Sequence, residues 1–289
     1  MASAQLVLDD EMEARRPEMI ELKLSLQDLI FTDPDVDDVF ILRYLISYRN
    51  NVPQAEEAIR FACKFRKENA SWLRSARDGD RTKAPNHDIL KRHMSGGVHK
   101  TTIHGAPFLF VRAGLTDSVR LMNTVTEEQM RKFFIYDKEV GFWKCDRLTR
   151  ESGRLVKMMG VLDFTNVSLF GNDNRFFQAM GDSSKISDRL HPQLVQRMVA
   201  INTGAAIQLL WQVGKLFMSE RTLAHMSVCT GFDKSVGAEA CPFAKQWVKV
   251  EDLPTFAGGK CECEGGCIAG IPNDYVGYKI DLVEKREKE

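Results

Sequence analysis

The strongest constraint on the fold is a helix-length segment, Ala205–Met218, that is apolar around almost its whole circumference. Its only strongly polar side chains are Gln208, Gln212 and Lys215, which lie four and three residues apart and form one narrow stripe. A surface helix is apolar over roughly a third to a half of its circumference, so this segment needs apolar cover on nearly every side. It is shorter than the about twenty apolar residues that span a bilayer. We therefore expect either a core helix or a lid whose inner face contacts an apolar ligand.

The composition is that of a soluble globular protein without a strong net charge. The 289 residues are 44% hydrophobic and 28% charged, and 40 basic residues balance 40 acidic ones. No global electric field therefore favours nucleic acid or strongly anionic membranes as partners. The N-terminus lacks the basic and apolar regions of a signal peptide, and no segment is apolar for long enough to span a membrane. We expect a cytoplasmic protein that does not bind nucleic acid.

The first third of the chain has a helical pattern. Residues 1–20 are charged and weakly patterned, which predicts a frayed or loosely docked helix. Apolar residues at helical spacing predict one helix through 36–45 and a second from Pro53 to about Asn69. The charged, turn-rich stretch Arg77–Pro85 is typical of a linker.

After this stretch, strand patterns alternate with helix patterns. Strands are predicted at 107–112, 156–164, 196–201 and 226–229. Between them, helices are predicted from Thr126 onward, at 172–190 and at 205–218. This alternation predicts an α/β domain whose sheet contains parallel pairs joined by crossover helices.

Several short motifs resemble the CRAL-TRIO family of lipid-binding proteins, and they occur in the order that the family has. Residues 37–69 resemble its N-terminal helical region, and residues 104–108, HGAPF, stand where its DGRPV element would be. The other matches are GVLDF at 160–164 for its xxDL strand, HP at 191–192 with VAIN at 199–202 for YP…xIxNAP, LFMSERT at 216–222 for the KPFLSPKT lid, and LPTFAGG at 253–259 for the closing LPxxxGG. The resemblance covers roughly residues 30–270.

The resemblance implies a fold class and a division of the chain. The fold would be the α/β CRAL-TRIO lipid-binding fold, with an N-terminal helical bundle followed by a mixed, largely parallel sheet that is flanked by helices and closed by a gating helix. The helical region would cover 1–76, the lipid-binding domain 86–260, and a Cys-rich C-terminal wrap with a charged tail 261–289. The apolar segment at 205–218 would be the gate.

The resemblance also implies a function. The protein would hold one hydrophobic ligand, such as a phospholipid, behind the gate and exchange it at membranes, where it would be bound peripherally and transiently. No cofactor other than the bound lipid is expected, and the protein would be a monomer. The alternative is a lipid- or haem-sensing adaptor that binds a partner protein, and a haem carrier would use Tyr48, His225 or Cys229 as its iron ligand.

Apolar walls would supply most of the affinity for a lipid. Each methylene removed from water contributes about 0.8 kcal/mol, and a headgroup hydrogen bond contributes about 1 kcal/mol. Alternate residues of a strand share one face of the sheet, so the candidate wall residues fall into groups of alternate residues. The alternation does not show which face of each strand lines the pocket. The candidates on the strands and on the gate are Phe108, Phe110, Arg112, Met158, Gly160, Leu162, Val199, Ile201, Leu209, Val213 and Phe217.

Four further residues are candidates for contact with a headgroup. Phosphatidylinositol-binding members of the family carry charged residues at positions that correspond here to Tyr48, with Arg49 beside it, to Gln193-Leu194 and to His225. The family has four charged side chains at these positions, and in this sequence three of them are replaced by side chains that are uncharged or only partly charged. Phosphatidylinositol is therefore not implied as the main ligand. Tyr48, Arg49, Gln193 and His225 remain candidate headgroup donors, together with Arg112, and surface hydrogen bonds or caps are the alternative roles.

Three cysteines lie close together near the C-terminal end, at Cys261, Cys263 and Cys267. The spacing C-x-C-x3-C is not a standard zinc pairing, and no histidine follows it. Plant and protist members of the family end in a similar GGxCxC…GGC element, which is part of the C-terminal wrap. We therefore predict a structural role without metal, and a metal site completed by Cys241 is the alternative.

The sequence contains no motif that indicates catalysis. G-x-S-x-G, a P-loop, HExxH and a dinucleotide fingerprint are all missing from it. Asp163 follows an apolar strand, but no motif places a histidine or a second carboxylate beside it. We therefore predict that the protein is not an enzyme and has no catalytic residues.

Overall fold

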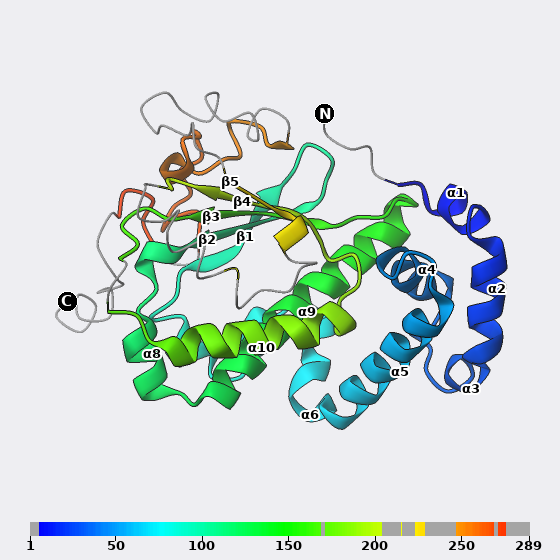
Figure 1. Cartoon of the computed structure of the whole chain (residues 1–289). Coiled ribbons are helices and arrows are strands. Elements are labelled where there is room, and N and C mark those ends of the chain that lie inside the picture. Colours follow the sequence, from blue (N-terminus) through cyan, green and yellow to red (C-terminus); the bar gives the residue numbers. More distant parts are fainter. Residues whose placement is uncertain are drawn as a thin grey trace.

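A five-stranded sheet forms the centre of the computed structural model, which describes residues 6–168, 171–203, 215, 223–228, 247–268 and 271–275 (Figure 1). The strand order is β1-β2-β3-β4-β5; β1 pairs antiparallel with β2, and all other neighbours are parallel. The strands are β1 Gly96–Thr101, β2 Pro107–Arg112, β3 Met158–Asp163, β4 Val195–Ile201 and β5 Met226–Val228. The mixed, largely parallel sheet of the predicted fold class is thus confirmed.

A bundle of helices precedes the sheet (blue in Figure 1). Asp37 and Asn51 cap two of these helices, because each side-chain oxygen accepts a hydrogen bond at 3.0 Å from the backbone N–H three residues later. The helices are α1 Leu8–Glu13, α2 Arg16–Ser25, α3 Gln27–Ile30, α4 Asp38–Ser47 and α5 Val52–Glu68. The last two correspond to the two helices that the sequence predicts.

Within residues 6–20, the prediction of a frayed or loosely docked helix is wrong. Leu8, Met19 and Leu22 are buried in the same apolar cluster as the inner residues of α4 and α5. The backbone N–H of Leu8 also donates to the carbonyl of Gly153 at 3.0 Å. The sparse apolar residues of this segment therefore suffice to dock it.

The stretch predicted as a linker is folded into short helical turns. Tyr136 donates to the carbonyl of Asp80 at 3.0 Å, and Arg81 forms an ion pair with Asp137, so the stretch is held against a long helix. The short elements here are α6 Ala70–Leu73, η1 Arg74–Asp78, η2 Arg81–Lys83 and α7 His87–Leu90. Charged side chains of this segment therefore contact the rest of the protein and are not only exposed to solvent.

Helices also lie in the connections from β2 to β3 and from β3 to β4. The connection from β2 to β3 contains η3 Ala113–Leu115, α8 Ser118–Thr124 and α9 Glu127–Ser152, and that from β3 to β4 contains α10 Asn174–Leu190. Helix α9 begins where the sequence predicts it, with a capping box formed by Thr126 and Gln129. Among the helices of the described ranges, none combines the length and the apolarity needed to cross a membrane.

The two faces of the sheet have different covers, as Figure 1 shows: α9 and α10 lie on one side and the orange C-terminal segment on the other. We call residues 247–268 and 271–275 the C-terminal segment; it includes η6 Thr255–Ala257. We call the sheet face beneath it the C-terminal face, and the opposite one the helical face. The predicted gate at 205–218 lies outside the described residues, except for Lys215.

Candidate functional site

The wall candidates from the strands do not share one face of the sheet. Phe108, Phe110, Val199 and Ile201 lie on the C-terminal face, where each is at most 2% exposed and packs with residues of the C-terminal segment. Met158, Gly160 and Leu162 alternate with them and lie on the helical face. The candidates Leu209, Val213 and Phe217 lie outside the described residues. A single pocket therefore cannot be lined by all the strand candidates together.

Arg112 also lies on the closed C-terminal face. Its guanidinium donates to the backbone carbonyls of Pro272, at 3.3 Å, and of Tyr275, and it lies 4.6 Å from the centroid of the Phe256 ring. It is buried beside Asp163, with 3.9 Å between Nε and Oδ2. These contacts tie the C-terminal segment to the sheet and leave Arg112 directed away from the helical face.

Part of the helical face is apolar and only partly buried, although Met158 and Ala200 on the same face are buried. The side chains of Leu109, Val111, Leu162 and Met198 are only half-buried, whereas their neighbours on the other face are fully buried. Gly160 gives Met198 room to lie across the sheet, because a Cβ at this position would be 2.4 Å from Met198 Sδ. The result is a partly accessible apolar floor with a tightly packed back.

The headgroup candidates lie near one end of this floor, where the parallel strands begin. Gln193, just before β4, donates from Nε2 to Ser47 Oγ at 2.9 Å, so it meets the end of α4, where Tyr48 and Arg49 follow. His225, just before β5, lies with Nδ1 3.1 Å from the carbonyl of Gln196 in β4. Positions that are far apart in the sequence are thus grouped at the amino ends of β4 and β5.

Lys157 is a residue of this site that the sequence analysis missed. It precedes β3, and its Nζ donates to Gln193 Oε1 at 3.1 Å. The side chain is half-buried, and burial, together with the nearby charge of Arg43, lowers the pKa of its ammonium group. The only sequence signal was a single cation at the start of an otherwise apolar strand. With Gln193 and Ser47 it makes a small polar site that can donate hydrogen bonds to a phosphate or a hydroxyl.

A buried ionic cluster holds the turn that carries Gln193. Arg66 of α5 donates to both carboxylate oxygens of Glu139 at 2.7 and 3.1 Å and to the carbonyl of Leu190 at 2.8 Å. His191 lies on the same carboxylate, with 2.7 Å between Nε2 and Oε2. Burial alone would raise the pKa of Glu139, but the charge of Arg66 and the contact with His191 hold it far below its usual range. The N-terminal helices thereby fix the chain just before β4.

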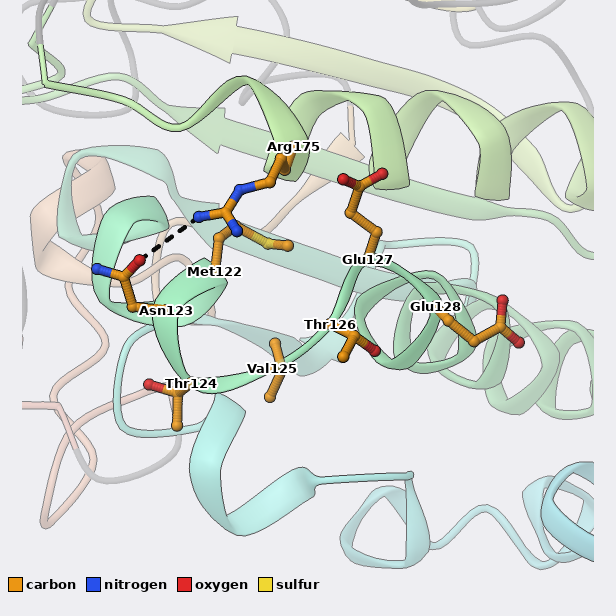
Figure 2. A pocket seen from close by; sticks show the side chains of 8 residues that line it. All are labelled: Met122, Asn123, Thr124, Val125, Thr126, Glu127, Glu128 and Arg175. Atoms are coloured by element: carbon orange, nitrogen blue, oxygen red, sulfur yellow. Dashed lines mark hydrogen bonds between the residues drawn. The ribbon is translucent and has the colours of Figure 1, made fainter.

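A separate surface depression lies where α8 meets the beginnings of α9 and α10 (Figure 2). Arg175 reaches across it, with 3.4 Å from Nη2 to Asn123 Oδ1, and is ion-paired with Asp173. The lining side chains are Met122, Asn123, Thr124, Val125, Thr126, Glu127, Glu128 and Arg175. This lining is largely polar and includes none of the predicted wall or headgroup residues.

Comparison with known proteins supports the resemblance noted in the sequence. The family model described as CRAL/TRIO domain matches residues 91–259. The Sec14 cytosolic factor of Schizosaccharomyces pombe is 25% identical over 251 residues, which cover 85% of this chain and 82% of that protein. The phosphatidylinositol/phosphatidylcholine transfer proteins SFH11 and SFH9 of Arabidopsis thaliana are 24% and 22% identical over 62% and 92% of this chain. The chain spans less than half of these two plant proteins, 47% and 45% of their lengths.

A solved structure has the same fold. The crystal structure of Sfh5 superimposes with a TM-score of 0.57 over 96% of this chain and 98% of that one, at 12% sequence identity. At this identity the similarity establishes the arrangement of helices and strands and says nothing about the ligand.

Proposed function

This chain belongs to the CRAL/TRIO domain family, and on that premise we propose that it binds one phospholipid or similar hydrophobic molecule and transfers it between membranes. The names of its relatives in fission yeast and Arabidopsis, a cytosolic factor and phosphatidylinositol/phosphatidylcholine transfer proteins, support this class of function. The structural observation that carries the proposal is the half-buried apolar floor formed by Leu109, Val111, Leu162 and Met198. An apolar surface left accessible at the centre of a sheet costs free energy unless a ligand covers it.

The gate is part of the proposal. Strands β4 and β5 are parallel neighbours, and such pairs are joined by right-handed crossovers in nearly all proteins. A right-handed connection would carry the chain between them over the helical face, as it does for α9 and α10. We propose that the apolar segment Ala205–Met218 covers the ligand there, with Leu209, Val213 and Phe217 as contacts, and moves aside at a membrane surface.

The strand residues proposed as ligand contacts are now fewer. Met158, Gly160 and Leu162 stay in the set, and Leu109, Val111 and Met198 join it. Phe108, Phe110, Arg112, Val199 and Ile201 support the floor from behind instead, because they pack against the C-terminal segment.

The polar end of the ligand is proposed to lie at the amino ends of β3 to β5. Lys157 and Gln193 would donate to the headgroup, with Tyr48, Arg49 and His225 at the edge of the same site. Lys157 supplies a cation near the group of positions where family members that bind phosphatidylinositol carry charges. A phosphate ester or a hydroxyl fits these donors, whereas a purely hydrocarbon ligand would give the ammonium group of Lys157 no partner beyond Gln193 among the described residues.

We further propose that the protein acts as a cytoplasmic monomer, visits membranes transiently and catalyses no reaction. Asp163 supports the last point, because its Oδ1 already accepts hydrogen bonds from the backbone and hydroxyl of Thr165, at 3.0 and 2.6 Å, and from Asn202 at 2.8 Å. The carboxylate is buried and organises the turn after β3, so it is not directed at a substrate.

Native mass spectrometry of the purified full chain, followed by organic extraction, tests the binding step. We expect one lipid per chain, and a fluorescent analogue of that lipid should move between donor and acceptor vesicles when the protein is added. A protein that carries no lipid and takes none up from vesicles would refute the proposal. A coloured, haem-bearing protein that transfers no lipid would instead support the adaptor alternative.

A further inference from the structure

One histidine and three cysteines meet between β1 and the C-terminal segment. The potential ligand atoms of His99, Cys261, Cys263 and Cys267 all lie within 4.8 Å of one another. His99 comes from the middle of β1, and the cysteines come from a chain segment more than 160 residues later. The three cysteines are close in sequence, but their meeting with His99 depends on the fold, and the proposed lipid site uses none of the four.

Two distances between these atoms match those between ligands of a tetrahedral metal centre. His99 Nε2 lies 3.4 Å from Cys261 Sγ, and Cys261 Sγ lies 3.7 Å from Cys263 Sγ. A zinc ion with Zn–S bonds of about 2.3 Å and Zn–N bonds of about 2.0–2.1 Å separates two sulfurs by about 3.8 Å and sulfur from nitrogen by about 3.5 Å. A disulfide would bring two sulfurs to about 2.05 Å. The two distances therefore fit ligands around an ion and do not fit a covalent bond.

The surrounding structure positions each of the potential ligands. His99 is buried on the C-terminal face, with its ring centroid 6.2 Å from that of Phe110. Cys267 is buried in the same apolar cluster, whereas Cys263 is exposed and closes the site from the solvent side. Gly266 makes the return of the chain possible: its φ is +97°, and a Cβ there would be 1.8 Å from the carbonyl oxygen of Ile271.

A second layer of contacts holds the cysteines. Asn273 Nδ2 lies 3.2 Å from Cys267 Sγ and 2.8 Å from the carbonyl oxygen of Cys261, and its Oδ1 accepts from the backbone N–H of Cys267 at 3.0 Å. Hydrogen bonds of this kind orient metal-binding thiolates and stabilise their charge. As a free thiol, Cys267 donates to the Cys261 carbonyl at 3.2 Å, and metal binding would replace that proton.

We propose that His99, Cys261, Cys263 and Cys267 bind one zinc ion, which fastens the C-terminal segment to the edge strand β1. Soft thiolates with one imidazole favour zinc over hard cations such as Mg²⁺ or Ca²⁺. Four protein ligands leave no open position for a substrate, so the site is structural. Binding releases the three thiol protons, and the bound centre carries a net charge of minus one, from one Zn²⁺ and three thiolates.

The proposal replaces the expectation of a metal-free cysteine cluster. That expectation rested on the spacing of the cysteines, on the resemblance to the family's C-terminal wrap and on the missing histidine after the motif; the structure supplies a histidine from before it. Cys241, the alternative fourth ligand, lies outside the described residues. The zinc site would hold the back of the sheet closed behind the floor that carries the lipid, whether or not the protein transfers lipid.

Metal analysis of the full chain, purified from cells grown with zinc, tests the proposal. We expect one zinc per chain by inductively coupled plasma mass spectrometry. Replacement of zinc by cobalt(II) should give thiolate-to-cobalt charge-transfer bands and the intense visible absorption of tetrahedral coordination. His99→Ala and Cys263→Ala should each weaken zinc binding at least about tenfold in competition with a chromogenic chelator, and Asn273→Ala should weaken it about 10–100-fold.

Matched variants separate loss of a ligand from loss of the fold. Cys263→Ala changes an exposed side chain, so its circular dichroism should stay native while its affinity for zinc falls. Cys63→Ser in α5 and His87→Ala in α7 should keep one zinc per chain. The proposal would be overturned if the wild-type chain, loaded with zinc and dialysed, held no zinc, or if it bound zinc no more tightly than Cys263→Ala in competition with the chelator. A disulfide among the three cysteines in the native protein would also overturn the proposal. So would the binding of another metal in preference to zinc when the protein is loaded with zinc and that metal together.

Discussion

His191 and Glu139 form a contact between two buried groups: Nε2 lies 2.7 Å from Oε2, and the two side chains are 1% and 2% exposed. Glu139 is ionised because Arg66 donates to it, so it accepts and His191 donates from Nε2. Among the described residues, His191 Nδ1 has no hydrogen-bond partner. A second proton on the ring would therefore be buried without an acceptor. Burial accordingly lowers the pKa of His191, despite the neighbouring carboxylate.

This cluster predicts that the protein loses stability as the pH falls. The native state keeps His191 neutral, whereas the unfolded chain takes up the proton near pH 6.5. The free energy of unfolding should therefore decline below about pH 7, by up to about 1.4 kcal/mol per pH unit for this one proton. The lowered pKa of Glu139 acts in the same direction and adds a further loss below about pH 4.3, where the unfolded carboxylate becomes protonated. Urea unfolding followed by tryptophan fluorescence between pH 8 and pH 4 measures the slope.

His191→Gln is the matched control for this pH effect. Glutamine keeps a donor toward Glu139 but cannot titrate. The free energy of unfolding should therefore depend less on pH between about pH 7 and pH 5, by an amount that corresponds to the uptake of nearly one proton on unfolding. Burial also lowers the pKa values of His87 and His93, and the positive charges of Lys91 and Arg120 add to the effect on them, so a residual slope should remain. Arg66 and Lys138 are the cations that face His191 and disfavour its charging, and both are unchanged in the variant. An unaltered slope would show that His191 is already charged in the native state.

Glu139→Gln should be strongly destabilising at pH 7. The change leaves Arg66 buried, with a side chain 14% exposed, and without its countercharge. Removal of one partner from a buried ion pair costs about 3–5 kcal/mol, because the remaining charge is not resolvated. We expect a loss of this size in the free energy of unfolding, measured by urea denaturation.

Glu57→Gln provides the comparison for that experiment. Glu57 pairs with Arg189 at 2.8 Å, nearly the same distance, but its side chain is 76% exposed. An exposed pair contributes about 0–1 kcal/mol, so this variant should unfold almost as the wild type does. Equal losses in the two variants would show that burial does not set the energy of the Glu139 pair.

The strands and helices that could be predicted from the sequence are those with a strong local signal. Strand β2 has the predicted bounds, Pro107–Arg112, because its apolar run ends in turn residues on both sides. Strand β1 was not predicted, since an edge strand that begins with Gly96-Gly97 and contains His99 and Lys100 has no clear alternation. The boundary of the helical region at residue 76 and the extent of the gate remain predictions.

The candidate site depended on contacts that no local pattern contains. Alternation along β3 separates Val161 from Leu162, but only the packing of the C-terminal segment shows which of the two is closed off. Lys157 and Gln193 meet across one strand and one crossover connection, and His99 meets Cys261 only because β1 has a particular register on β2. Sequence spacing could not predict these pairs, because each depends on the completed sheet.

Two neighbouring residues of β3 test which face of the sheet carries the lipid. Leu162→Trp adds bulk to the half-buried helical face, so it should reduce the amount of bound lipid while the fold stays intact. Val161→Trp adds the same bulk to the closed C-terminal face, where overpacking should cost about 1–3 kcal/mol of stability. Native mass spectrometry and urea denaturation of both variants measure the two effects. Full lipid occupancy in a well-folded Leu162→Trp would place the ligand elsewhere.

Lys157→Met tests the polar end of the site. A charged hydrogen bond to a headgroup contributes about 1.5–3 kcal/mol, so its loss should weaken binding of an anionic phospholipid about 10–150-fold. Methionine keeps the apolar part of the side chain, and the site loses only its cation beside Gln193. Titration with vesicles that contain either anionic or zwitterionic phospholipid in a neutral matrix gives both affinities. Lys185→Met is the control, because Lys185 lies on the exposed side of α10 and is paired with Asp182 at 3.4 Å. If Lys157→Met and Lys185→Met weaken binding equally, general surface charge rather than a headgroup contact governs the affinity.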